Sequence, residues 1–155
     1  MDVVTLDALS PQDRELVELA EAARGRAYSP YSNHYVGAAV RAASGMVYAA
    51  CNVEIVSLQQ SVHGERNAVN MMAAGGDRRI ETLVCCGHLS GIPCAECRQA
   101  IWEFCGADPT VPIICVARDG TVRRFTIGEL YPHPYGPESK NVDPGAFVGP
   151  GRRAT

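Results

Sequence analysis

The chain has 155 residues, a formal net charge of −3 and seven cysteines. This length is typical of one domain that buries roughly 70% of its unfolded surface without needing disulfides. No apolar run approaches the roughly 20 residues of a membrane span, and the basic residues form no stripe that would fit nucleic acid. The odd cysteine count and the lack of a recognisable signal peptide predict a reduced, cytoplasmic protein.

The first predicted elements are a helix and a hairpin. Ser10 and Pro11 are a typical helix start, with Ser10 as the cap. Two apolar runs, 35–42 and 46–53, follow and are separated by a short loop in which Gly45 suits a positive φ. We therefore expect a β-hairpin after the first helix.

Helices and apolar strands then alternate along the chain. We expect a helix at about 63–74, a strand at 80–86, a helix opened by Pro93, and strands at 111–117 and 121–125. The strand-helix-strand unit should form a right-handed parallel crossover. The pattern predicts an α/β fold, a three-layer sandwich with helices on both faces of a mixed five-stranded sheet.

The C-terminal part differs in composition. The proline-rich segment 131–137 is incompatible with a regular helix or a central strand. Residues 141–155 are rich in Gly, Pro and Arg and are expected to form a flexible tail. The sequence thus predicts one domain, residues 1–140, followed by that tail.

Chemistry-bearing residues gather in two short motifs. His63-Gly64-Glu65 is followed 28 residues later by Pro93-Cys94-Ala95-Glu96-Cys97. His63, Cys94 and Cys97 supply three ligands for zinc, and a count of three is typical of catalytic zinc, which leaves its fourth position to water. The carboxylate of Glu65 is not needed as a ligand.

This ordered pair of motifs is the signature of zinc-dependent nucleobase deaminases. The chain resembles the cytidine deaminase family from about Ala27 to Glu138. The segments that carry the resemblance are Ala27–Ser32 with Val36–Ala39, Cys51–Glu54, Gln59–Glu65 and Pro93–Gln99. The resemblance implies the family's α/β/α sandwich, one Zn²⁺ per subunit, and hydrolysis of cytidine and 2′-deoxycytidine to uridine, 2′-deoxyuridine and ammonia in pyrimidine salvage.

The motif residues match the needs of that reaction. A zinc ion can lower the pKa of water to about 7, and a helix N-terminus favours the thiolate forms of Cys94 and Cys97. Glu65 is expected to take the water's proton and pass it to the ring and then to the leaving amine. Residues two apart on a helix do not share a face, so His63 must lie at the irregular start of its helix.

Substrate contacts follow from the resemblance. Asn52 and Glu54 match the family's N-x-E motif, which holds the ribose 3′-hydroxyl. His34 stands where the family usually has a Phe that stacks on the pyrimidine, and Gly64 replaces the usual Ala, keeping the backbone N–H that contacts the base. Tyr135 matches a C-terminal aromatic residue that, in tetrameric relatives, completes the pocket of a neighbouring subunit, although packing under the proline-rich loop is an equal alternative.

The motifs of this chain combine features that resemble two different branches of the family. Arg66 is typical of the tetrameric branch, where it offsets the charge of a third cysteine, whereas a histidine ligand such as His63 is typical of the dimeric branch. We therefore predict a slightly more electropositive zinc site than in either branch. The compact length and the Tyr135 segment favour a homotetramer over a dimer.

Competing functions remain open at this point. His34, Leu58 and Gly64 depart from the family and would suit a modified cytidine or a blasticidin-like antibiotic, although Glu54 favours a plain ribose. A catalytically inactive zinc-binding interaction protein would have no use for Glu65. A structural zinc site would need a fourth ligand, for which Cys51 or His88 are the candidates. The expected partner is a small nucleoside, with no polymeric nucleic acid and no membrane.

Overall fold

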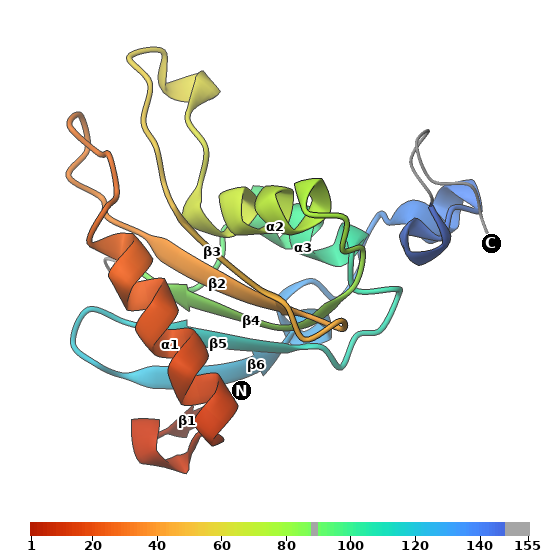
Figure 1. Ribbon diagram of the computed structural model, residues 1–155, viewed down its shortest axis with the longest axis horizontal. Coiled ribbons are helices and arrows are strands. Elements are labelled where there is room, and N and C mark those ends of the chain that lie inside the picture. The colour runs from red at the N-terminus through yellow and green to blue at the C-terminus, as the bar shows by residue number, and fades with distance from the viewer. Residues whose placement is uncertain (88–89, 148–155) are drawn as a thin grey trace.

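A computed structural model describes residues 1–87 and 90–147 of the chain. One mixed β-sheet lies at the centre of the molecule, and the helices pack on it (Figure 1). The strands are β1 (Asp2–Val4), β2 (Gly37–Ala42), β3 (Val47–Cys51), β4 (Ile80–Cys86), β5 (Pro112–Val116) and β6 (Val122–Thr126). Their order is β1-β6-β5-β4-β2-β3, and within the described residues only β4 and β5 pair in parallel. The predicted mixed sheet and its parallel crossover are confirmed.

The sheet has six strands, so the predicted count of five is wrong by one. β1 pairs antiparallel with β6, with Asp2 opposite Arg124 and Val4 opposite Val122. Three residues are too few to display the two-residue periodicity by which a strand is recognised. This strand exists because β6 offers it a free edge, which is a tertiary property.

The helices cover both faces, as predicted (Figure 1). They are α1 (Pro11–Arg24), α2 (Gly64–Ala74), α3 (Ala95–Glu103) and the short α4 (Ile127–Leu130). Alternate residues of each strand point to opposite faces. Val84 and Ile114 pack with α1 in one buried cluster, whereas Leu83 and Ile113 pack with α2 and α3 in the other.

Helix and hairpin details follow the sequence signals. Ser10 caps α1 by accepting a hydrogen bond from the Asp13 amide at 3.1 Å. Gly45 turns the β2–β3 hairpin with φ +86°. The 3₁₀ turns outside these elements are Leu6–Ala8, Leu58–Gln60, Pro137–Lys140 and Pro144–Ala146.

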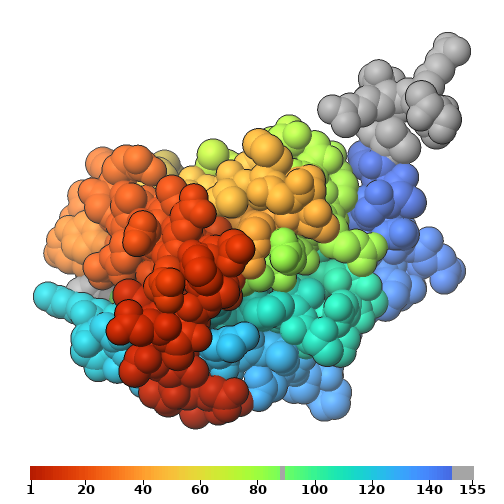
Figure 2. Space-filling model, turned by 60° about the horizontal axis from the view of Figure 1, so that its bottom comes forward, coloured from red at the N-terminus to blue at the C-terminus, as the bar shows by residue number. Residues whose placement is uncertain are grey.

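Residues 137–147 lie at the end of the molecule away from residues 28–36 (Figures 1 and 2). Part of the expected tail, residues 141–147, is described: Pro144 is buried and Asp143 lies 3.6 Å from the Arg79 guanidinium. The rest of that prediction, residues 148–155, lies outside the described residues. Among the residues that are described, no helix is both long and apolar enough to cross a membrane.

Candidate functional site

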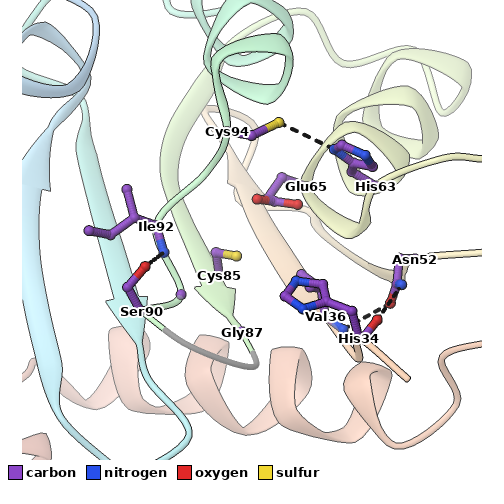
Figure 3. A pocket seen from close by; sticks show the side chains of 11 residues that line it. His34, Val36, Asn52, His63, Glu65, Cys85, Gly87, Ser90, Ile92 and Cys94 are labelled. Atoms are coloured by element: carbon purple, nitrogen blue, oxygen red, sulfur yellow. Dashed lines mark hydrogen bonds between the residues drawn. The ribbon is translucent and has the colours of Figure 1, made fainter. Parts of the chain in front are cut away.

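Three potential metal ligands converge where α2 and α3 begin, and Figure 3 shows two of them, His63 and Cys94. His63 Nδ1 lies 3.3 Å from Cys94 Sγ and 3.4 Å from Cys97 Sγ. All three ligand atoms lie within 4.8 Å of one another. Tetrahedral zinc with ordinary Zn–S and Zn–N bonds requires about 3.6–3.8 Å between such atoms. The donor types and their spacing therefore fit zinc, as predicted.

The ligand set has three members in the part of the chain that the structure describes. Cys51, one of the two candidates for a fourth ligand, is not part of the cluster. His88, the other candidate, lies outside the described residues. A three-ligand set leaves a coordination position open, which is the arrangement of catalytic zinc.

Local backbone geometry explains how His63 and Glu65 face the same point. His63 is the N-cap of α2 and has an extended backbone, with φ −77° and ψ 151°. The direction of its side chain is therefore not fixed by the helical repeat. Gly64 and Glu65 are the first two helical residues. Cys94 is likewise the N-cap of α3, one residue before the helix, with Cys97 in the first turn. The required irregular start of the helix is present.

Glu65 is buried, with 5% of its surface exposed, and its carboxylate lies beside the ligand cluster (Figure 3). Burial, reinforced by the negative charge of Glu65, raises the pKa of the Cys97 thiol above its ordinary value of 9.0. The same two causes raise the pKa of Cys85, and they raise that of Cys115 to about 12. A zinc ion bound at this cluster would oppose both effects and favour the thiolate form of Cys97.

The cluster opens into a cavity of about 260 Å³. The predicted residues in its wall are His34, Asn52, His63, Glu65 and Cys94. The sequence analysis missed the remaining wall residues, which are Val36, Cys85, Gly87, Ser90, Gly91 and Ile92. Most of these follow the carboxyl end of β4 beside the parallel strand β5, the kind of position where α/β sheets commonly bind ligands, and that rule would have singled them out.

Asn52 and Glu54 lie just after β3, as expected, and both are buried. Asn52 reaches the cavity wall, whereas Glu54 does not line it. The Glu54 carboxylate instead accepts hydrogen bonds from the backbone N–H groups of Tyr31 and Ser32 and from the Ser32 hydroxyl. These donors, the Ser32 hydroxyl above all, lower the pKa of Glu54 below its ordinary value of 4.5.

Gly64 fits a tight place. A Cβ at this position would lie 3.1 Å from both Val36 Cγ1 and the Val36 carbonyl oxygen, and 3.4 Å from the Asn52 nitrogen. Such contacts are closer than an ordinary van der Waals approach. The backbone of α2 therefore lies directly against the residues that lead into β2.

Arg66 turns toward α3. Its guanidinium forms an ion pair with Glu96, a residue that stands between the two cysteine ligands, and donates to the Ser61 carbonyl at 3.2 Å. The sequence analysis did not anticipate Glu96. Its negative charge offsets the electropositive contribution expected from Arg66.

Tyr135 does not line the cavity within one chain. It is 61% exposed, and its carbonyl oxygen accepts a hydrogen bond of 2.7 Å from the side chain of Gln99 in α3. The structure of one chain therefore does not bring Tyr135 together with the other predicted site residues.

Comparison with known proteins gives one family. Residues 10–114 match the model of the cytidine and deoxycytidylate deaminase zinc-binding region. A cytidine deaminase of Sporosarcina psychrophila is 32% identical over 80% of this chain and 91% of its own length, and one of Vibrio parahaemolyticus is 32% identical over 92% of this chain, which spans 46% of that longer protein. The crystal structure of cytidine deaminase from Burkholderia pseudomallei has a TM-score of 0.74 at 34% identity, covering 82% of this chain and all of that one.

Proposed function

This chain belongs to the cytidine and deoxycytidylate deaminase family, whose members are zinc-dependent hydrolases, and we propose that its substrates are cytidine and 2′-deoxycytidine. Water replaces the exocyclic amine of the pyrimidine, and the products are uridine or 2′-deoxyuridine and ammonia. The observation that carries the proposal is a buried carboxylate, Glu65, which lines one cavity with His63 and Cys94, two members of the ligand set that Cys97 completes. A structural zinc site has no use for that carboxylate.

In the proposed mechanism, Glu65 carries both protons that are transferred. Zinc, when bound, supplies the Lewis acidity that activates a water molecule at neutral pH. Glu65 accepts the proton of the attacking water and transfers it to ring nitrogen 3 as carbon 4 is attacked. It then carries the second proton to the leaving amine, which departs as ammonia. One buried carboxylate therefore serves as base and then as acid, and the walls of the cavity limit access of bulk water.

Nucleoside binding is assigned to residues on the cavity wall and behind it. We propose that His34, which lines the cavity, packs against the pyrimidine. We also propose that the backbone N–H of Gly64, which stands between the wall residues His63 and Glu65, contacts the base. Asn52 on the cavity wall and the buried Glu54, which does not line it, are assigned to the ribose 3′-hydroxyl, as the family's N-x-E motif implies. Arg66 acts on the zinc site from outside the ligand set.

The assembly and setting are part of the same proposal. A homotetramer is supported by the exposed aromatic ring of Tyr135, which would be available to a neighbouring subunit. One domain over residues 1–140 is supported by the single sheet that all six strands share. A role in cytoplasmic pyrimidine salvage is supported by seven cysteines that are all free thiols, the form expected in a reducing compartment.

Ammonia release by the zinc-loaded protein tests the proposal. The panel contains cytidine, 2′-deoxycytidine, free cytosine, a 5-substituted cytidine, a blasticidin-type antibiotic and an aminopurine. We expect the first two to react fastest and Glu65→Gln to lower kcat by about 10²- to 10⁴-fold. Glu18→Gln, an exposed change on α1, is the matched control. Wild-type turnover of cytidine no faster than that of Glu65→Gln would overturn the proposal.

A further inference from the structure

We propose that Arg98, the residue after the last cysteine of the ligand set, is a positioning residue that fixes the direction of the Cys94 side chain toward zinc. This role rests on the zinc site of the proposed function and requires no assumption about the substrate. Cys94 needs such support because it is exposed, whereas Cys97 is buried in the first turn of α3. Packing can hold the second thiol in place, but not the first.

The start of α3 has no side-chain cap. Cys94 is its N-cap residue, with an extended backbone at φ −70° and ψ 172°, and its side chain makes no capping hydrogen bond. A serine, threonine or aspartate at an N-cap normally fixes the first turn by accepting from a backbone N–H. The Cys94 sulfur instead faces His63 Nδ1 at 3.3 Å (Figure 3). The turn that carries this ligand must therefore be held by another group.

Arg98 binds the peptide groups on both sides of Cys94. Its backbone N–H donates to the Cys94 carbonyl at 2.9 Å, which is an ordinary helical bond. Its Nε donates to the Pro93 carbonyl at 2.7 Å. These two carbonyls belong to the planar peptide groups that precede and follow the Cys94 Cα, so the two bonds together restrain both backbone dihedral angles of Cys94. Those angles set the direction of the Cα–Cβ bond and hence of the sulfur.

The other arm of the guanidinium reaches a fixed point outside α3. Arg98 Nη1 donates to the Leu130 carbonyl at 3.0 Å. Leu130 is the last residue of α4 and is buried in the same hydrophobic cluster as Ile101 and Trp102 of α3. The donors of an arginine form a rigid, planar fork, so one bond orients the other. The turn that carries Cys94 is thereby attached to the core of the protein and not only to its own helix.

Removal of the guanidinium should weaken metal binding. We expect Arg98→Met to lower zinc affinity by about 10- to 100-fold, the range for residues that orient metal ligands. Arg98→Lys should recover only part of this loss, because an ammonium group is a point donor and cannot hold two carbonyls in a fixed geometry. Competition for zinc with a chromophoric chelator measures both affinities.

Arg78 supplies a matched control. It is half-buried, as Arg98 is, and its guanidinium also donates to two backbone carbonyls, those of Ala73 and Asp77. These carbonyls lie at the C-terminal end of α2, whereas the ligand His63 lies at its N-terminal end. Arg78→Met therefore loses comparable hydrogen bonds and should leave zinc affinity unchanged.

Cobalt absorption reports the arrangement of the ligands without any turnover. Co²⁺ binds the same imidazole and thiolate ligands as zinc, and its visible absorption bands depend on their geometry. We expect the bands to shift or weaken in Arg98→Met and to match those of wild type in Arg78→Met. Urea unfolding shows that each variant is folded. If Arg98 acted only on stability, Arg98→Met would unfold at a lower urea concentration, but the folded variant would keep the wild-type bands.

Wild-type zinc affinity and cobalt bands in Arg98→Met would overturn the inference, and so would an equal loss of affinity in Arg78→Met. If Arg98→Met does not fold, Arg98→Lys is the test, and wild-type zinc affinity in that variant would overturn the inference in the same way. Wild-type protein that binds zinc without deaminating cytidine would refute the proposed function, whereas loss of zinc affinity in Arg98→Met would still support the role of Arg98.

Discussion

Reversing the Arg66–Glu96 ion pair should weaken zinc binding, because the pair joins the starts of the two helices that carry the ligands. Arg66 lies three residues after His63, and Glu96 lies between Cys94 and Cys97. The informative changes are Arg66→Glu, Glu96→Arg and both together. Each single change places like charges opposite each other, and the double change restores an ion pair in the opposite sense.

The exposure of the two side chains, 29% for Arg66 and 58% for Glu96, determines how much free energy the ion pair is expected to contribute. A partly exposed pair contributes up to about 1 kcal/mol, and the like-charge repulsion of a reversal costs a similar amount. The total of about 2 kcal/mol corresponds to a roughly 30-fold loss of zinc affinity, within the range of about 10- to 100-fold for residues that orient ligands. We expect the double variant to recover to within about fivefold of wild type.

Competition for zinc against a chromophoric chelator measures the affinity directly. Arg24→Glu is the matched control, since Arg24 forms an ion pair with Glu21 at 30% exposure on α1, remote from the ligands. It should leave zinc affinity unchanged. Arg66→Glu protein that binds zinc as tightly as wild type, or a double variant no better than the worse single one, would refute the reasoning.

Three further outcomes follow from burial, backbone geometry and charge. Alkylation of metal-free protein, read by mass spectrometry, should modify the exposed Cys94 and spare Cys85, whose pKa burial raises, and zinc should protect Cys94. Gly37→Ala should lower the free energy of unfolding in urea by about 3 kcal/mol or more, because its Cβ would lie 2.0 Å from a carbonyl oxygen of α1, whereas Gly45→Ala, with φ +86° and open space, should cost about 1 kcal/mol. Hydrogen bonds lower the pKa of Glu54 in the folded protein, so the protection of the Tyr31 and Ser32 amides from hydrogen exchange should persist at pH 4.5 and above and be lost as the pH falls through that lowered pKa. A Glu54→Gln variant that shows the same pH step would contradict this assignment.

The potential zinc ligands could be predicted from the sequence because each of them lies in one of two short motifs. His63 and Cys94 are each the residue before a helix, and capping geometry follows from neighbouring residues. The buried strands could be predicted for a similar reason, since β5 and the second half of β4, from Leu83 to Cys86, are apolar runs. In both cases the signal and the structure span the same few residues.

The residues that form the far wall of the cavity could not be predicted from local sequence motifs. Cys85, Gly87 and Ser90 carry no motif, and they reach the cavity because β4 pairs in parallel with β5. Glu96 illustrates the same limit, since a charged residue in a helix's first turn is usually solvated. Only the packing of α3 beside α2 gives it Arg66 as a partner.

Glu54 shows that a motif can predict the position of a side chain without predicting its hydrogen-bond partners. The N-x-E spacing predicted two polar side chains at the exit of β3, and the structure has them there. Spacing alone does not say whether a carboxylate faces a substrate hydroxyl or two backbone amides, because both satisfy it equally well. The amides of Tyr31 and Ser32 come from a segment more than twenty residues earlier, so the choice depends on tertiary structure.

Two departures from the family pattern, His34 and Gly64, are physically connected. An alanine at position 64 would press on Val36, whose N–H is fixed by Asn52, which also holds the His34 carbonyl. A methyl group at position 64 would therefore have to displace a loop residue that cannot move without straining the bonds that place His34. The side chain at position 64 and the ring at position 34 should thus be exchanged together, and Gly64→Ala alone should disturb the placement of His34 more than the stability of α2.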